Sequence, residues 1–450
     1  MSRHRAGTVA ATLGALALAG ALATAIFEAR AARAERAEAE SRFDDVRRLA
    51  NSFLFEFHDA IKDLPGATPA RELVVRRALE YLEKLSSVRQ GDVQLQRELA
   101  GAYERVARVQ GGMFESNVGD TEGARKSLLR AIAIRERVAA TGGAANDREA
   151  LAETELQLAQ VLMTAGDAPG AAARARRAVA ALEALSAAAP RDRRLEARLA
   201  RAHRYVGAAL VRSSARKEAL AELMSAERSF DALVQAEPTS KALRRELAIT
   251  NQMIVHALGG SREREQALAS YTKAVALQSE LVAAEPGNSS YGRELAYTHV
   301  SMGAFYEWSG DAKAALETYA RALPILETLV ATDPRNADAR LLLAETCNSV
   351  GYAQVVAGSA AAGLANLERS RSLLEPITAA DPANVRATLG LARLYESLGT
   401  SSAGDRARAL VWYRKSEATY AALRSRGALD PQAAAELGAV VAKIAAGVRP

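Results

Sequence analysis

The sequence contains almost no cysteine and few aromatic residues. Among 450 residues there is one cysteine, Cys347, with 2 Trp and 8 Phe, and aromatic residues make up 5% of the chain. A single thiol excludes a disulfide framework and any zinc or iron–sulfur site built from several cysteines. With so few bulky side chains, we expect the core to form from close contacts between alanine-rich helices, which favours an extended all-α protein.

Excess charge and catalytic motifs are also scarce. The chain has 59 Lys and Arg against 53 Asp and Glu, a net charge of +6. Nucleic-acid-binding surfaces concentrate basic and aromatic residues on one face, so we expect no nucleic-acid partner. No GxxxxGK[ST] or HExxH pattern occurs, which predicts a protein that is not an enzyme and has no cofactor. His203, His299 and Cys347 share one repeat position, but equivalent positions of successive repeats are too far apart for metal ligation.

The one long uncharged run lies at the N-terminus. Residues 7–27 carry no charge and follow a short tail, residues 1–6. As a helix this run would be about 31 Å long, close to the roughly 30 Å hydrocarbon core of a bilayer. We therefore expect a single transmembrane helix at residues 7–27 that contacts the lipid bilayer. The alternative is a signal peptide cleaved near Ala25, which would release a soluble repeat protein. Small residues in the run also suggest the hypothesis of a homodimer.

From residue 92 onward the sequence repeats with a period of 48 residues. Prolines recur at exactly this interval, and a Leu-Ala pair follows each one, at Pro190, Pro238, Pro286, Pro334 and Pro382. Each period has the pattern of two amphipathic helices, a short turn between them and a proline-marked turn after the second. This predicts seven helix pairs over residues 92–430 and a capping helix with a tail at residues 431–450. Residues 28–91 are expected to form a juxtamembrane helix and a helical hairpin.

The repeat resembles the tetratricopeptide repeat. The positions that carry the resemblance in the best-matching period are Met302, Gly303, Tyr306, Ala315, Tyr319 and Ala322. The familiar unit has 34 residues. The fourteen additional residues equal two heptads, so longer helices would keep the same faces in contact. The resemblance implies a right-handed superhelical solenoid.

The segment ahead of the repeats carries a second resemblance. The stretch NSFLFEFHDAIKDLPGATPARELV, residues 51–74, is similar to the segment after the membrane span in bacterial membrane-bound serine/threonine kinases that carry such repeats. The kinase motifs are missing from this sequence, so no catalytic residue can be transferred. The resemblance implies a single-pass protein of the bacterial cytoplasmic membrane with extracytoplasmic, periplasmic repeats. The arginines that follow residue 27 favour the opposite orientation, and both stay open.

The expected function is therefore a membrane-anchored scaffold or sensor module for protein–protein interaction. A fragment of a split or truncated kinase is an alternative. In the repeat family one face of each first helix lines an inner groove, and transferring these positions gives eight candidates for binding a protein or peptide: Arg201, Arg204, Arg212, Tyr297, Val300, Trp308, Asn348 and Tyr352. A basic wall beside an aromatic patch would suit an extended peptide with acidic and apolar side chains. Alternatively, the arginines are solvated and Trp308 fills a packing gap.

Overall fold

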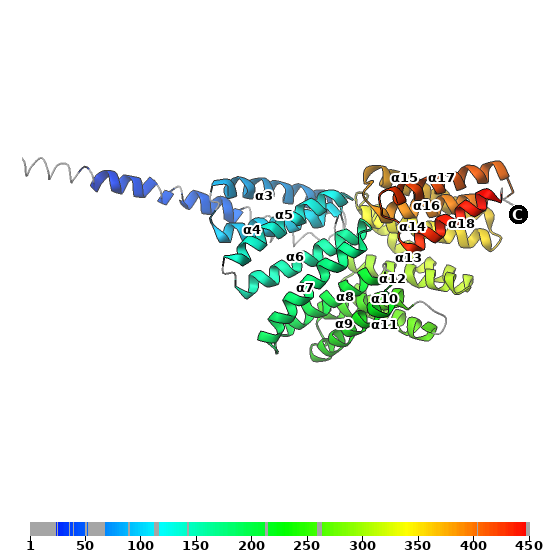
Figure 1. The fold of residues 1–450 in the computed structure, drawn as a ribbon, viewed down its shortest axis with the longest axis horizontal. Helices are drawn as coiled ribbons and strands as arrows, with labels where there is room; N and C mark the ends of the chain where they lie inside the picture. The colour runs from blue at the N-terminus through cyan, green and yellow to red at the C-terminus, as the bar shows by residue number, and fades with distance from the viewer. Residues whose placement is uncertain are drawn as a thin grey trace, which may run out of the picture.

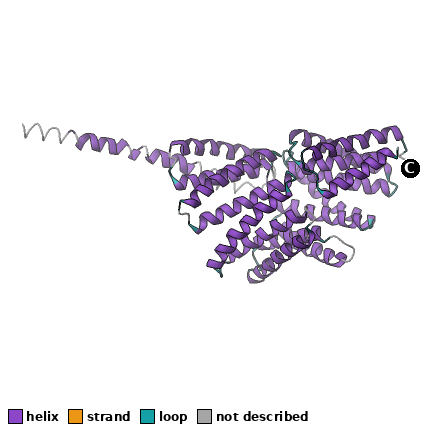
Figure 2. Cartoon of the chain, in the orientation of Figure 1, coloured by secondary structure: helices purple, strands orange, loops and turns teal. Residues whose placement is uncertain are grey.

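The protein is an all-α helical-repeat solenoid, described here from a computed structural model (Figures 1 and 2). The structure describes residues 68–446 apart from 89–90, 112–116, 142–143, 212–214, 259–262 and 403, and ahead of them residues 24, 26–35, 37–38, 40–49 and 52. These residues contain helices and no strand. The all-α repeat prediction is therefore confirmed.

The helices alternate between first and second members of a pair. A lone helix, α3 (Thr68–Val88), precedes them and α18 (Pro431–Ala445) follows them. The first helices are α4 (Val93–Gly111), α6 (Ala145–Thr164), α8 (Arg193–Val211), α10 (Lys241–Ala257), α12 (Ser289–Trp308), α14 (Ala337–Val356) and α16 (Val385–Ser401). Their partners are α5 (Thr121–Ala140), α7 (Ala168–Ala188), α9 (Arg216–Ala236), α11 (Arg264–Ala284), α13 (Ala312–Thr332), α15 (Ala360–Ala380) and α17 (Arg406–Ser425).

A glycine on the first helix allows the second helix to approach closely. A Cβ added at Gly303 would lie 2.4 Å from Cε1 of Tyr319, and one added at Gly207 would lie 2.6 Å from Cγ of Leu223. Tyr319 and Leu223 are fully buried. The glycine of the repeat pattern is therefore a packing residue, because only a missing side chain leaves room for these neighbours.

The turns are fixed by side-chain caps. Asp311 Oδ1 accepts a hydrogen bond from Ala314 N at 3.1 Å, and Asn336 Oδ1 accepts one from Ala339 N at 3.1 Å. Such caps satisfy backbone donors that a helix start leaves unpaired. Asp333 and Asn336 flank Pro334, and Asn336 N donates to Asp333 O at 3.0 Å. The recurring proline therefore marks the turn between pairs, as the period predicts.

The chain curves so that its first and last repeats approach each other. Figure 1 shows α3–α7 and α14–α18 as two arms, joined through α8–α13. We call these the N-terminal arm and the C-terminal arm. The turns of the N-terminal arm meet the turns ahead of α14 and α16, where Ala337 N donates to Asn117 O at 3.0 Å. The period alone does not predict this closure.

The predicted membrane localisation is corrected by the structure. Of the predicted span, residues 7–27, only residues 24, 26 and 27 are described, and the proposed cleavage site near Ala25 lies outside the described residues. Among the described residues, no helix is long and apolar enough to cross a membrane. The prediction of a single-pass protein in the cytoplasmic membrane is therefore wrong.

Candidate functional site

A ladder of ion pairs links each first helix to the next. Between α8 and α10, Arg201 Nε lies 2.9 Å from Glu246 Oε1, and between α10 and α12, Arg245 Nη2 lies 2.5 Å from Glu294 Oε1. The other bridges are Arg97 to Asp147, Arg194 to Glu149, Arg293 to Asp338, Arg386 to Glu345 and Arg393 to Glu436. Together they run from α4 to α18. The positive charge of this face is therefore balanced by carboxylates of neighbouring repeats.

The predicted arginines Arg201 and Arg204 converge on one carboxylate. Arg204 Nη2 lies 2.5 Å from Glu246 Oε2, and its side chain is 5% exposed. Arg201 also contacts Glu153 Oε1 at 3.1 Å. Burial alone would raise the pKa of Glu246, but Arg204, Arg201 and Arg245 hold it below its ordinary value. The arginines are therefore structural partners of Glu246, and their charges are already matched.

Sequence reasoning missed Glu246 and Glu294. A signal was present, because the tetrapeptide Arg-Glu-Leu-Ala occurs at residues 97–100, 245–248 and 293–296. An acidic residue that recurs beside a basic one at the repeat spacing indicates pairing between repeats. That signal would have predicted a self-neutralised face in place of a basic wall.

The aromatic part of the predicted face divides into a packed and an exposed section. Tyr297 and Val300 pack partly buried against the apolar cluster of α12, α13 and α14. The guanidinium carbon of Arg386 lies 5.7 Å from the centre of the Tyr297 ring, a cation–π distance. Burial is the main cause that raises the pKa of Tyr297. Tyr297 and Val300 therefore contribute mainly to packing between repeats.

Trp308 is the exposed member of this set. Its side chain at the end of α12 is 64% exposed, and Val356, one period later at the end of α14, is 63% exposed. Trp308 rests on Phe305, with ring centres 6.5 Å apart, and Phe305 in turn packs edge-on against Tyr271 at 6.0 Å. One side of the indole ring thus contacts Phe305, and the rest of the ring is open to solvent. Trp308 fills no packing gap.

Of the remaining predicted residues, two lie on α14 and one lies outside the described residues. Asn348 is half-buried, and within the described part of the chain its Oδ1 has no hydrogen-bond partner. Tyr352, one turn later, is half-buried. Arg212 lies outside the described residues. Asn348 and Tyr352 are thus placed on the helix that ends at Val356, four residues beyond Tyr352.

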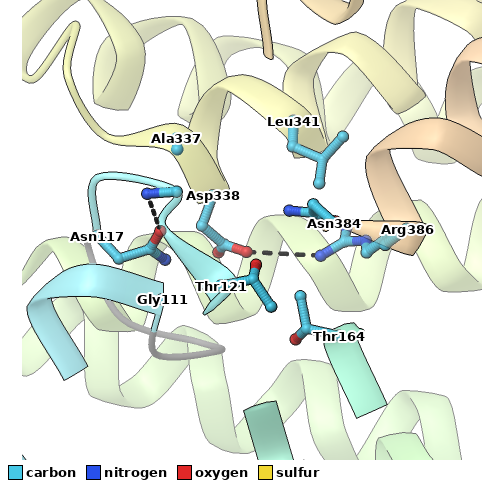
Figure 3. Close-up of a pocket in the computed structure, with 10 residues that line it drawn as sticks. Gly111, Asn117, Thr121, Thr164, Ala337, Asp338, Leu341, Asn384 and Arg386 are labelled. Atoms are coloured by element: carbon cyan, nitrogen blue, oxygen red, sulfur yellow. Dashed lines mark hydrogen bonds and ion pairs between the residues drawn. The ribbon is translucent and has the colours of Figure 1, made fainter. Parts of the chain in front are cut away.

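A small polar cavity lies where the two arms meet (Figure 3). Its volume is about 30 Å³, and each arm supplies half of its lining: Gly111, Asn117, Gly119, Thr121 and Thr164 from one, and Ala337, Asp338, Leu341, Asn384 and Arg386 from the other. Such a volume admits about one water molecule. Among the described residues, no group of His, Cys, Asp or Glu is arranged to hold a metal ion. The cavity is a junction between the arms and has no room for a substrate.

Comparisons with known proteins return structural resemblance only. No family model matches the sequence, and no curated protein matches it. A Rap protein complexed with Competence and Sporulation Factor is 12% identical, with a TM-score of 0.49 over 91% of this chain and 99% of that chain. The apo form of RapI is 12% identical, with a TM-score of 0.46 over 89% and 100%. A tetratricopeptide repeat protein from Parabacteroides merdae is 14% identical, with a TM-score of 0.34 over 75% and 99%.

Proposed function

We propose that the protein is an interaction scaffold that binds an extended, apolar segment of a partner protein across the ends of α12 and α14. The observation that carries the proposal is the exposure of Trp308 and Val356 at equivalent positions of successive first helices. Large aromatic residues that stand exposed on a rigid element are frequent energetic centres of protein interfaces. Tyr352 on α14 extends the same row.

Because the charged side chains of the first helices are already paired with each other, they favour a partner segment without charge. Because Arg201 and Arg204 already contact Glu246, a partner carboxylate would have to displace a formed ion pair. Removing one member from a buried pair is costly. The proposal therefore replaces the acidic peptide expected from the sequence with an apolar one, and assigns the arginines to holding the repeats together.

The distance between α12 and α14 predicts the spacing of the apolar residues in the partner peptide. α12 and α14 are in contact, and packed helices lie roughly 8–10 Å apart. A chain in the extended polyproline II conformation advances about 3.1 Å per residue and completes one turn in three residues, so side chains three residues apart point to the same side. A peptide that contacts both Trp308 and Val356 would therefore present apolar side chains about three residues apart.

Selection from a library of short random peptides on the immobilised full chain tests this proposal. Enriched peptides should carry apolar residues at the stated spacing and bind the Trp308→Ala variant roughly thirtyfold more weakly, the loss expected for a central interface residue. Val411→Ala is the matched control, because Val411 on α17 is 55% exposed and belongs to a second helix. Enriched acidic peptides, or equal binding to both variants, would refute the proposed site.

The relation to receptor-like kinases, the split-kinase alternative and the homodimer stay predictions, because no described feature of the chain tests them.

A further inference from the structure

Among the described residues, polar contacts between turns join the two arms. Thr121, at the start of α5, donates to Asp381 Oδ2 from its backbone N at 3.2 Å and from its Oγ1 at 2.7 Å. Ala337 N donates to Asn117 O at 3.0 Å. These contacts, which we call the clasp, join residues about 220 to 260 positions apart in sequence. They hold the closed shape of Figure 1.

Between the described residues of the two arms, the contact around the clasp is limited to a few points. Gly119 has φ +81°, and a Cβ added there would lie 3.1 Å from the Ala337 Cβ, so the turns touch closely at one point. A second point is Gly166, which approaches Val385, and a third is the exposed ion pair between Arg335 and Glu72 at 2.7 Å. The described helices of the two arms do not pack along one another. Interfaces that are small and polar permit relative motion of the parts they join.

The connecting part of the chain contains a weak packing position. At four equivalent repeat positions stand the buried apolar residues Leu182, Phe230, Leu326 and Leu374, but α11 has Gln278 there. Gln278 is 1% exposed, and within the described residues neither its Oε1 nor its Nε2 has a hydrogen-bond partner. A buried amide without partners weakens the packing around it.

Helix α11, which carries Gln278, also packs weakly on the helix that follows it. α11 packs on α12 less extensively than any other described second helix packs on the first helix that follows it. Gln278 and the less extensive α11–α12 contact therefore lie at the same place, in the part of the chain that joins the two arms. A relative rotation of the arms would meet least resistance at this place.

We propose that the solenoid opens and closes about the α11–α12 junction, and that the clasp holds the closed state. Opening separates Thr121 from Asp381 and Asn117 from Ala337, and frees the α12–α18 half to move relative to the α3–α11 half. Because Trp308 and Val356 both lie in the α12–α18 half, the proposed binding surface moves as one piece.

Ala337→Pro tests the clasp without harming the helix. Ala337 is the first residue of α14, where proline is favoured, and Asn336 has the extended conformation (φ −70°, ψ 97°) that a following proline requires. The change removes the N–H that donates to Asn117. The matched control is Lys241→Pro, at the equivalent first position of α10, which follows Ser240 (φ −72°, ψ 103°) and is remote from the clasp.

The expected result is a larger radius of gyration of the full chain by X-ray scattering in Ala337→Pro but not in Lys241→Pro. Hydrogen exchange of the Thr121 amide should also accelerate about tenfold, the order expected from losing one hydrogen bond of the clasp. Unchanged scattering and unchanged Thr121 exchange in Ala337→Pro would overturn the clasp.

A further variant tests the hinge. Gln278→Leu places an apolar side chain at the buried position and should slow hydrogen exchange of the Thr121 amide, because firmer packing at the hinge resists opening. A rise in thermal stability with unchanged Thr121 exchange would overturn the hinge.

None of these readouts uses a ligand, so they are independent of the proposed binding function. Loss of peptide binding in a chain that opens normally would refute only the proposed function.

Discussion

The first helices α8 and α12 occupy the same place in the repeat but differ in chemistry. Arg201 and Arg204 of α8 correspond to Tyr297 and Val300 of α12, each 96 residues later. The arginines of α8 contact Glu246 of the next repeat. Tyr297 and Val300 pack against apolar side chains of their own and the following repeat. The same backbone position therefore holds neighbouring repeats together by ion pairing in one place and by apolar packing in another.

This difference indicates that charged residues on a first helix do not by themselves mark a binding surface. Arg201 and Arg204 of α8 pair with Glu246 of α10, whereas the exposed residue of α12, Trp308, is apolar. A basic sequence pattern thus indicates an internal bridge in this molecule. The exposed aromatic residue is the better guide to a partner surface.

The largest expected effect is that of Glu246→Ala. The change leaves Arg204, which is 5% exposed, without its carboxylate, so the free energy of unfolding should fall by about 3–5 kcal/mol. Chemical denaturation of the full chain measures this loss. Glu280→Ala is the control, because Glu280 is 60% exposed and its pair with Arg244 is worth at most about 1 kcal/mol. Equal losses in the two variants would show that α8 and α10 do not depend on the buried pair.

The next effect concerns His299 of α12 and His203 of α8, which also occupy equivalent positions. His299 is buried, and burial, with a smaller contribution from Arg321, lowers its pKa from 6.5 to about 4. The unfolded chain therefore takes up this proton at a higher pH than the folded chain does. As the pH falls from about 6.5 to about 4, stability should decline by up to about 3 kcal/mol because of this group.

His299→Gln should remove that part of the pH dependence, measured as the slope of unfolding free energy against pH. His203→Gln is the matched control, because His203 occupies the same repeat position but has a carboxylate partner, with its Nδ1 2.6 Å from Glu222 Oε2. The prediction fails if the slope between pH 4 and 6.5 is the same in His299→Gln as in the unmodified chain.

A smaller effect is expected at the glycine of the repeat. Gly303→Ala places a Cβ against the buried ring of Tyr319, and overpacking of this kind should cost about 1–3 kcal/mol. Gly438→Ala in α18 meets no atom within 4 Å, so it should instead stabilise the chain by about 0.4–1 kcal/mol. Thermal unfolding distinguishes the two, and a stabilised Gly303→Ala would contradict the close packing of α12 on α13.

The smallest effect on stability should come from Trp308→Ala. An exposed side chain contributes little to folding, so the free energy of unfolding should change by no more than about 0.5 kcal/mol. Denaturation, with peptide binding measured on the same sample, checks this. A large loss of stability would make Trp308 a packing residue, and its exposure could then no longer be contrasted with the buried Arg204 of α8.

Much of the local structure could be predicted from the sequence, because its determinants lie close together in the chain. The spacing of Gly303, Ala315 and Tyr319 indicates how two neighbouring helices pack. Pro334 marks a turn because it directly follows Asp333, the C-cap of α13, a position where proline is common. The candidate site was harder to predict. Arg201 is visible as a charge, but its partner Glu246 belongs to another repeat, and a charge alone does not reveal whether it faces water or a carboxylate.

The sequence by itself determined the helix pairs and their repetition, because periodic apolar positions and turn residues act over a few residues at a time. Tertiary structure alone decided the closure of the arms at Thr121 and Asp381. That closure depends on the small rotation between repeats, which accumulates over the whole solenoid before the ends meet. It also decided that Trp308 stays exposed while Arg204 is buried, because exposure depends on the neighbours that the curvature brings together.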